Sequence, residues 1–177
     1  VFPENAVLNV IEGTPYLEQF QTVARRLEVP LLAGVTTRTA ENLERFRRGV
    51  AEEEIRVGHR RFGPVHNSAV IITADGIVSQ YDKVHLLPFT ERPTGERLFT
   101  ALGWIDPYRR FILSVLGYIG TGVPASEVRL LSIPNRKLPP FWTPLCFELA
   151  DARLAREARA KGARYFLNLT SEGDLGP

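Results

Sequence analysis

The chain has 177 residues, of which 44% are hydrophobic and 24% are charged. This length and composition fit one globular domain with a substantial core, and they exclude a disordered chain and a bundle of membrane-spanning helices. The net charge of +2, from 22 basic and 20 acidic residues, does not indicate a nucleic-acid partner. The only cysteine, Cys146, rules out an internal disulfide. Because the sequence has no Met and no signal peptide, we expect an excerpt of a longer protein.

The first third of the sequence predicts a helix, a strand and a surface excursion. Thr14 can cap a helix that has Pro15 at its first position. Apolar residues then recur at the spacing of one helical face, namely Leu17, Phe20, Ala24 and Leu27. The helix ends before Pro30, and the short apolar run 31–36 predicts a buried strand. The polar stretch 38–64 predicts a surface excursion with one helix near 40–50.

A β-hairpin is predicted in the middle of the chain. Residues 67–73 and 77–81 are strand-like runs, joined by a turn in which Asp75-Gly76 supplies a positive φ. The hairpin delivers Lys83 at its far end. Beyond it, Asp106-Pro107 starts a helix that ends at a group of glycines. The apolar residues predicted to share one side of this helix are Tyr108, Phe111, Ile112, Val115, Leu116 and Ile119.

Cys146 is predicted to lie at a junction between a strand and a helix. Residues 128–133 and 141–145 predict a strand pair, whose second member is weakened by Pro144. The run 164–169 predicts a final strand. The helix after the cysteine has a face marked by Phe147, Ala150, Leu154 and Ala158. Because helices and strands alternate along the chain, the predicted fold class is α/β.

Three residues carry candidate chemistry. A thiol at a helix N-terminus faces the positive end of the helix dipole and free N–H groups, so Cys146 could be a nucleophile; the alternative is that it packs as a small hydrophobic residue. Lys83 could stabilise an oxyanion, or it could be an edge-strand lysine that discourages aggregation. Glu4 could be a general base, or it could be a solvated surface residue.

The order Glu4, Lys83, Cys146, with each residue at the end of a strand, resembles the nitrilase or carbon–nitrogen hydrolase superfamily, whose members use a Glu-Lys-Cys triad. The segment 67–91 contains Tyr81-Asp82-Lys83-Val84-His85-Leu86-Leu87-Pro88-Phe89 and then Glu91. It closely resembles the catalytic domain of bacterial apolipoprotein N-acyltransferase, whereas soluble amidases usually lack the Pro-Phe-x-Glu continuation. The resemblance implies a four-layer α-β-β-α sandwich, formed by a single partial domain over 1–177 that is incomplete at both ends.

The resemblance also implies a role for each matching position. Cys146 would be the nucleophile, Glu4 the base and Lys83 the oxyanion stabiliser, while Glu91 and Glu148 would be supporting carboxylates. The chain departs from the family at Thr90, where Gly is usual. It also departs over 171–176, which lacks the aromatic residue of a family loop that helps to shape the acyl site.

The long stretch between Lys83 and Cys146 corresponds to an arm that lies over the active site at the membrane in the acyltransferase. The resemblance places this membrane-facing arm around 92–127. Its helix is too short to span a bilayer, which takes about 20 apolar residues. It could instead rest its apolar side in the lipid interface, or pack on the core as an ordinary amphipathic helix. The apolar residues in question are Phe111, Ile112, Val115, Leu116 and Ile119.

The implied reaction moves a fatty acyl chain from a phospholipid, through a thioester on Cys146, to the N-terminal amine of a diacylated lipoprotein. This places the protein at the bacterial inner membrane, on the periplasmic side, with the membrane surface as a further partner. A soluble amidase that uses water as second nucleophile and a catalytically degenerate binding domain are the alternatives. No cofactor is implied, and no metal site is expected because the histidines, His59, His66 and His85, lack ligand spacing.

Overall fold

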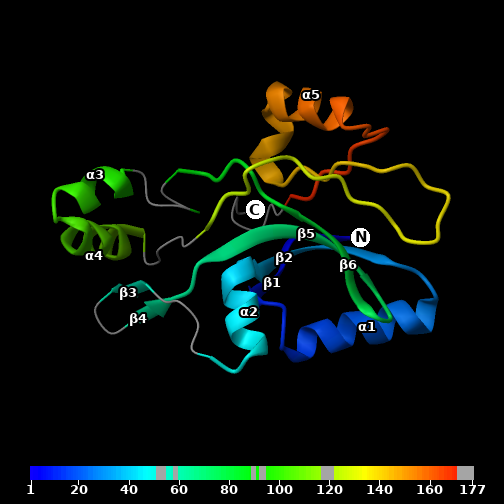
Figure 1. Ribbon diagram of the computed structural model, residues 1–177, viewed down its shortest axis with the longest axis horizontal. Helices are drawn as coiled ribbons and strands as arrows, with labels where there is room; N and C mark the ends of the chain where they lie inside the picture. Colours follow the sequence, from blue (N-terminus) through cyan, green and yellow to red (C-terminus); the bar gives the residue numbers. More distant parts are fainter. Residues whose placement is uncertain (51–54, 58–59, 89–90, 92–94, 117–121, 171–177) are drawn as a thin grey trace, which may run out of the picture. The chain divides into compact units, whose positions relative to one another are not determined.

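A computed structural model describes residues 1–50, 55–57, 60–88, 91, 95–116 and 122–170 (Figure 1). The chain divides into two compact units. The first consists of Val1–Thr37, His66–His85 and Pro124–Pro177, and the second of Arg38–Val65 and Leu86–Val123. The described chain combines helices with a mixed sheet, so the predicted α/β class is confirmed, although the strands between residues 55 and 82 follow one another without an intervening helix.

The centre of the first unit is a mixed sheet of four strands in the order β1-β2-β5-β6. The strands are β1 (Phe2–Val10), β2 (Leu31–Arg38), β5 (Val65–Thr73) and β6 (Gly76–Asp82). β1 pairs with β2 in parallel, and β5 pairs with β6 as the predicted antiparallel hairpin. Gly76 has a φ of +125° at the hairpin turn, a backbone conformation that L side chains rarely adopt.

Helix α1 (Pro15–Leu27) covers one face of this sheet. Its side chains Leu17 and Phe20 pack against a buried cluster made of Ile11, Ala33, Val35, Val70 and Ile72. Pro15 opens the helix as predicted, but Thr14 donates its hydroxyl to the Ile11 carbonyl at 2.8 Å instead of capping the helix. Leu27, expected on the buried face, is exposed because the helix ends there.

The opposite face of the sheet packs on a second layer of extended segments, and α5 (Ala152–Ala160) covers that layer (Figure 1). Within the first unit the layers therefore follow the order helix, sheet, extended layer, helix. The sheet contributes Leu32, Ala69, Ile71 and Tyr81 to this core. The extended layer and α5 contribute Val128, Leu131, Phe141, Trp142, Leu145, Leu154, Ala158 and Leu169.

The extended layer differs from the strands predicted at 128–133, 141–145 and 164–169. The described chain forms isolated bridges there, between Leu131 and Phe141, Trp142 and Phe166, and Leu145 and Leu169. Prolines at 139, 140 and 144 explain the difference, since proline has no N–H to donate to a ladder. Side-chain packing replaces part of the missing pairing, and the rings of Phe141 and Tyr165 stack with centroids 5.1 Å apart.

The second unit contains α2 (Ala40–Arg47), β3 (Ile55–Val57), β4 (Arg60–Phe62), α3 (Glu96–Ala101) and α4 (Ile105–Leu116). Helix α2 is the predicted helix of the polar excursion, and Thr39 caps it by accepting from the Asn42 N–H at 3.3 Å. The β3-β4 hairpin and α3 were not predicted. Helix α4 begins where Asp106-Pro107 predicted it, whereas the glycines expected to end it at 117 and 120 lie outside the described residues.

Candidate active site

Glu4 lies on β1 and is only 5% exposed, which excludes the solvated surface position considered from the sequence. Its Oε1 accepts a hydrogen bond from Asn67 Nδ2 at 2.7 Å. The backbone that carries Glu4 lies close to the neighbouring strand, which is possible because position 34 is Gly. A Cβ there would lie 2.5 Å from the Glu4 Cα and 2.8 Å from the Pro3 carbonyl oxygen. Gly34 therefore lets the β2 backbone approach the base of Glu4 closely.

Lys83 follows β6 directly and is only 1% exposed, so it is not a solvated edge-strand lysine. Its Nζ lies 3.3 Å from Glu4 Oε1, which makes a buried ion pair. Main-chain bonds hold the residue on both sides: its N–H donates to the Asn67 carbonyl at 2.8 Å, and its carbonyl accepts from Ala125 at 2.9 Å. Desolvation makes a buried ion pair costly to form, but removal of one partner leaves the other charge uncompensated.

Cys146 begins a short 3₁₀ turn, Cys146–Ala150, and is partly exposed. Its φ of +52° lies in the left-handed region, which costs a non-Gly residue about 1 to 3 kcal/mol. The bond from its N–H to the Leu169 carbonyl, at 2.8 Å, helps to hold this conformation. The Glu4 carboxylate and the Lys83 ammonium, which are paired with each other, both act on the pKa of this thiol, so the structure brings Glu4, Lys83 and Cys146 together.

The pKa of the Cys146 thiol is raised, which is opposite to the direction expected for a helix N-terminus. Burial is the main cause and the Glu4 carboxylate is the second, while the Lys83 ammonium and the Phe147 N–H oppose them. The expectation failed because the cysteine opens a five-residue 3₁₀ turn, and α5 starts only at Ala152. Phe147, predicted on a buried helix face, is 64% exposed for the same reason. The resting thiol is therefore protonated.

Glu148 is fully buried and accepts hydrogen bonds from several donors. Its Oε1 accepts from the Val84 N–H at 2.7 Å and the His85 N–H at 3.0 Å, directly after Lys83. Its Oε2 accepts from the Leu145 N–H at 3.1 Å, directly before Cys146. The Tyr81 hydroxyl donates to the same carboxylate at 2.8 Å. Glu148 thus joins the backbone after Lys83 to the backbone before Cys146.

The environment of Tyr81 fixes the direction of its bond to Glu148. Burial, followed by the negative charge of Glu148, raises the pKa of Tyr81 far above its ordinary value. The phenol therefore remains a hydrogen-bond donor at all physiological pH values. The tyrosine ring also packs edge-to-face on Trp142, with centroids 6.4 Å apart.

Glu91 belongs to the second unit, so its support of the triad stays a prediction. Within that unit its Oε2 accepts from the Leu87 N–H at 2.7 Å, and its carbonyl accepts from the Gly122 N–H at 2.9 Å. These bonds tie the segment after Lys83 to the end of the arm.

The residues predicted to form one apolar side of α4 separate in the structure. Ile112 is 5% exposed, whereas Phe111 and Val115 are more than 60% exposed. The side chain of Leu116 and all of Ile119 lie outside the described residues. A helix turns by about 100° per residue, and the buried side of α4 includes Ile112 and leaves the adjacent Phe111 exposed. The predicted single side is therefore wrong for these two residues.

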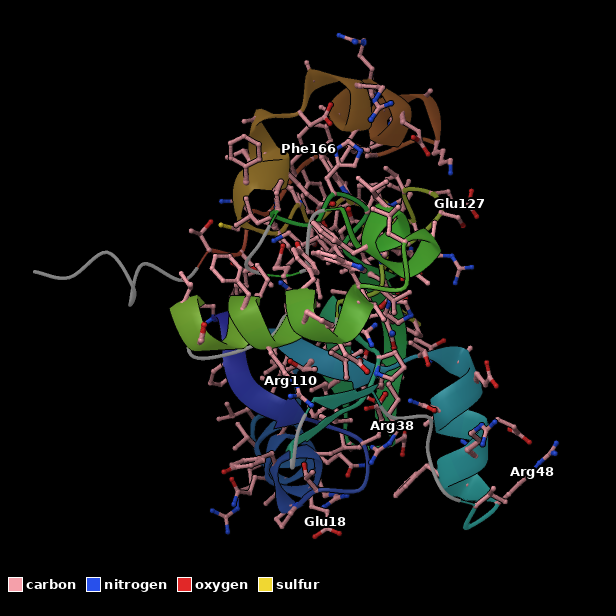
Figure 2. All side chains as sticks on the ribbon, turned by 90° about the vertical axis from the view of Figure 1, so that its left-hand side faces the viewer. Glu18, Arg38, Arg48, Arg110, Glu127 and Phe166 are labelled. Atoms are coloured by element: carbon pink, nitrogen blue, oxygen red, sulfur yellow. The ribbon has the colours of Figure 1, made fainter. Side chains whose placement is uncertain are left out.

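Sequence reasoning also missed the exposed apolar residues of α3 and of its connection to α4. Leu98, Leu102 and Trp104 are each at least 60% exposed, like Phe111 and Val115. The two helices hold together through a stack of Phe99 on Tyr108, with ring centroids 4.2 Å apart. Arg110 also lies on α4 (Figure 2). We call Leu98, Leu102, Trp104, Phe111 and Val115 the arm surface.

Asn67, the hydrogen-bond partner of Glu4, was missed although the sequence held a signal for it. The register of the hairpin pairs Ser68 with Asp82, so Asn67 lies beside Lys83. Register counted from the Asp75-Gly76 turn would have placed Asn67 next to the lysine. Among the described residues no three His, Cys, Asp or Glu side chains gather as a metal site. In the same part of the chain no helix is both long and apolar enough to cross a membrane.

Comparisons with curated proteins identify relatives of this chain. It is 24% identical over 174 residues to apolipoprotein N-acyltransferase 2 of Treponema pallidum, covering 97% of this chain and 27% of that protein. It is 32% identical over 119 residues to apolipoprotein N-acyltransferase of Rhodopseudomonas palustris, covering 66% of this chain and 20% of that protein. No family model matches the chain. The resemblance expected from the sequence is confirmed, and the chain spans less than a third of the length of either relative.

Solved structures of carbon–nitrogen hydrolases are also similar to this chain. An amidase from Nesterenkonia sp. AN1 matches with a TM-score of 0.48 and 15% identity, covering 88% of this chain and 42% of that one. A carbon–nitrogen hydrolase from Helicobacter pylori G27 matches with a TM-score of 0.48 and 17% identity, covering 88% of this chain and 38% of that one.

Proposed function

We infer that this chain is part of an enzyme of the carbon–nitrogen hydrolase superfamily, and we propose that it contributes the catalytic groups of an apolipoprotein N-acyltransferase. The observation that carries the proposal is the clustering of three groups. The Glu4 carboxylate is paired with the Lys83 ammonium at 3.3 Å, and both charges act on the pKa of the Cys146 thiol. A base, a nucleophile and a cation close to one another are what acyl transfer through a thioester requires.

In the first half-reaction Glu4 takes the proton of Cys146 as the sulfur attacks the ester carbonyl of a phospholipid. The raised pKa of the thiol means that this proton must be removed during the attack, which gives Glu4 its task as general base. Lys83 stabilises the negative charge on the carbonyl oxygen. The carbon–oxygen ester bond then breaks, Glu4 returns the proton to the departing lysophospholipid alkoxide, and the acyl group remains on sulfur as a thioester.

In the second half-reaction the N-terminal amine of a diacylated lipoprotein attacks the thioester. Glu4 accepts the proton that the amine loses, the carbon–sulfur bond breaks, and the Cys146 thiol is restored by that proton. The product is an amide on the lipoprotein, and the kinetics are ping-pong. This activity places the protein at the bacterial inner membrane, with these groups on its periplasmic side.

Replacement of Cys146 by Ser tests the proposed nucleophile. In the complete protein we expect Cys146→Ser to form no acyl-enzyme and to lose acyl transfer by about a thousand-fold or more, because a serine hydroxyl is a far weaker nucleophile than a thiol in a site built for sulfur. Mass spectrometry of the protein after incubation with phospholipid measures the added acyl mass. Leu149→Ala, an exposed change on the same turn, is the control and keeps wild-type activity.

Two results would contradict the acyltransferase assignment. An acyl-enzyme on the Cys146→Ser protein would show that another residue is the nucleophile. Release of free fatty acid by the wild-type protein, with no transfer to a lipoprotein amine, would show that water is the second nucleophile and that the protein is a hydrolase.

We further propose that the arm surface meets the lipid from which the acyl chain is taken. Its five large apolar side chains are at least 60% exposed, and the exposed Arg110 on α4 can meet anionic headgroups. We expect the double variant Trp104→Ser and Phe111→Ser to raise the KM for phospholipid by about thirty-fold and to leave kcat nearly unchanged, since each of the two side chains contributes about 1 kcal/mol at an interface.

The matched control for this prediction is Leu138→Ser in the first unit, where Leu138 is 52% exposed. It removes an exposed apolar side chain that is not part of the arm surface, and we expect an unchanged KM. Initial-rate kinetics on vesicles of defined lipid composition give both constants. Equal effects of the two changes on KM would count against a specific role for the arm surface.

A further inference from the structure

We propose that His85 and Asp151 form a positioning pair that holds the turn after Lys83 against the turn that carries Cys146, an inference that rests on the proposed function for its catalytic consequence. His85 Nδ1 lies 2.6 Å from Asp151 Oδ2. The two residues stand close in sequence to two different reactive groups, His85 two positions after Lys83 and Asp151 five positions after Cys146. Their contact therefore joins two segments that are 66 residues apart in the sequence.

The hydrogen-bond pattern defines the state of the imidazole. Arg153 Nη2 lies 2.8 Å from His85 Nε2, and a guanidinium can only donate. His85 Nε2 must therefore accept, which places the ring proton on Nδ1, where it is donated to Asp151. His85 is thereby oriented by a partner on each ring nitrogen.

Asp151 is itself fixed from several directions. Its Oδ1 accepts from the N–H groups of Arg153 at 2.8 Å and Leu154 at 3.3 Å, which caps α5. Its own N–H donates to the Glu148 carbonyl at 2.9 Å. Although burial opposes it, these N–H groups and the nearby His85 and Arg153 lower the pKa of Asp151, so the carboxylate is charged at neutral pH. Asp151 Oδ1 thus caps α5 and Asp151 Oδ2 binds His85. A mutation can remove one of these interactions and keep the other.

The turn needs such a support because regular sheet pairing ends here. β6 is an edge strand that ends at Asp82, and the bond from the Lys83 N–H to the Asn67 carbonyl is its last link to β5. The next residues are held by the Glu148 carboxylate, through the backbone of Val84 and His85, and by the side-chain bond to Asp151. Glu148 restrains the backbone from the core, whereas His85 restrains it from the α5 side. Loss of the outer support would let the turn move and would loosen the Lys83 ammonium from its place near the sulfur.

Two substitutions of His85 test whether its bond to Asp151 matters or whether its side chain only fills space. The amide nitrogen of Asn can take the place of Nδ1, whereas the amide of Gln reaches the place of Nε2 and leaves Asp151 without its partner. In the complete protein we expect His85→Gln to lower the rate of acyl-enzyme formation about five-fold at saturating phospholipid, with KM unchanged, and His85→Asn to restore most of that rate. Arg156→Gln, an exposed change on α5, is the surface control.

Asp151→Ser supplies the reciprocal test. Serine is a good helix cap, so α5 keeps its N-terminal bond, but its short side chain cannot reach His85. We expect the same five-fold loss as for His85→Gln, and no further loss in the double variant, because both changes remove the same contact. Thermal unfolding midpoints of all variants are compared in the same preparation.

Alkylation of Cys146 by iodoacetamide separates this proposal from the proposed function, because it requires no acyl donor. A loosened Lys83 stabilises the thiolate less, so His85→Gln and Asp151→Ser slow alkylation about three-fold at neutral pH while His85→Asn does not. This pattern supports the positioning pair even if no acyl-enzyme ever forms. Wild-type alkylation rates in His85→Gln and Asp151→Ser, or losses that add in the double variant, would overturn it.

Discussion

Glu4→Gln should make Cys146 react faster with a small neutral alkylating agent and Lys83→Met should make it react more slowly, although both variants lose acyl transfer. The Glu4 carboxylate raises the pKa of the thiol, whereas the Lys83 ammonium lowers it. Removal of the negative charge therefore increases the thiolate fraction at neutral pH, and removal of the positive charge decreases it. Acyl transfer fails in both cases because one variant lacks the base and the other lacks the oxyanion stabiliser.

The size of the change in alkylation rate depends on two opposing effects of the thiol pKa, one on the thiolate fraction and one on the nucleophilicity of the thiolate. Each unit by which the pKa falls increases the thiolate fraction about ten-fold at a pH well below the pKa. The intrinsic nucleophilicity of the thiolate falls as its pKa falls, with a Brønsted coefficient of about 0.5, so the net gain is about three-fold per unit. The alkylation rate of the wild-type protein should rise with pH until it passes the raised pKa of Cys146, and this midpoint should move down in Glu4→Gln and up in Lys83→Met.

Iodoacetamide labelling of the complete protein across a pH series, followed by mass spectrometry, measures these midpoints. Glu18→Gln, on the exposed side of α1, is the matched control for loss of a carboxylate and should leave the midpoint in place. A shift of both midpoints in the same direction would mean that Glu4 and Lys83 do not act on the sulfur as separate charges.

Glu148→Ala should destabilise the protein by about 4 kcal/mol, whereas Glu148→Gln should cost about 2 kcal/mol. The alanine variant leaves the N–H groups of Val84, His85 and Leu145 and the Tyr81 hydroxyl without their acceptor in a buried site. Glutamine keeps one carbonyl oxygen for the N–H groups of Val84 and His85, and its amide can donate to the Tyr81 oxygen, but it leaves the Leu145 N–H without an acceptor. Urea unfolding of the complete protein, read out by pulse proteolysis, gives the free energies.

The control for Glu148 is Glu127→Ala, which removes an exposed carboxylate paired with Lys161 (Figure 2). Surface ion pairs contribute little, so the unfolding midpoint should not move. Equal stability of Glu148→Ala and the wild type would mean that the donors around this carboxylate find other acceptors. It would contradict the conclusion that Glu148 supports the turn after Lys83 and the turn that carries Cys146.

Much of the first unit could be predicted from local sequence. The spacing of Leu17, Phe20 and Ala24 predicted α1, and the Asp75-Gly76 turn predicted the hairpin. These elements are encoded by neighbouring residues, through periodicity and turn chemistry. The extended layer was predicted less well, because runs such as 141–145 are apolar enough for strands while their prolines prevent regular pairing. The β3-β4 hairpin and α3 carry weak local signals within charged stretches, and they were missed.

The candidate site likewise has features that the sequence predicted and features that it did not. Sequence order and motif pointed to Glu4, Lys83 and Cys146, and hairpin register could have added Asn67. The buried donors of Glu148, the link from His85 to Asp151 and the sign of the Cys146 pKa shift could not be obtained in this way. Each depends on distances between residues that are 60 or more positions apart, or on burial, and a local pattern encodes neither.

The sequence by itself determined the α/β class, the principal helices and strands of the first unit, and the relationship to apolipoprotein N-acyltransferases. Only the tertiary structure decided how the reactive groups are supported. It showed that Cys146 opens a strained 3₁₀ turn instead of an α-helix, so burial and the Glu4 charge outweigh the expected helix dipole and raise the thiol pKa. The physical reason is that electrostatic energies depend on distance and desolvation, which are set only when β1, the turn after β6 and the Cys146 turn pack together.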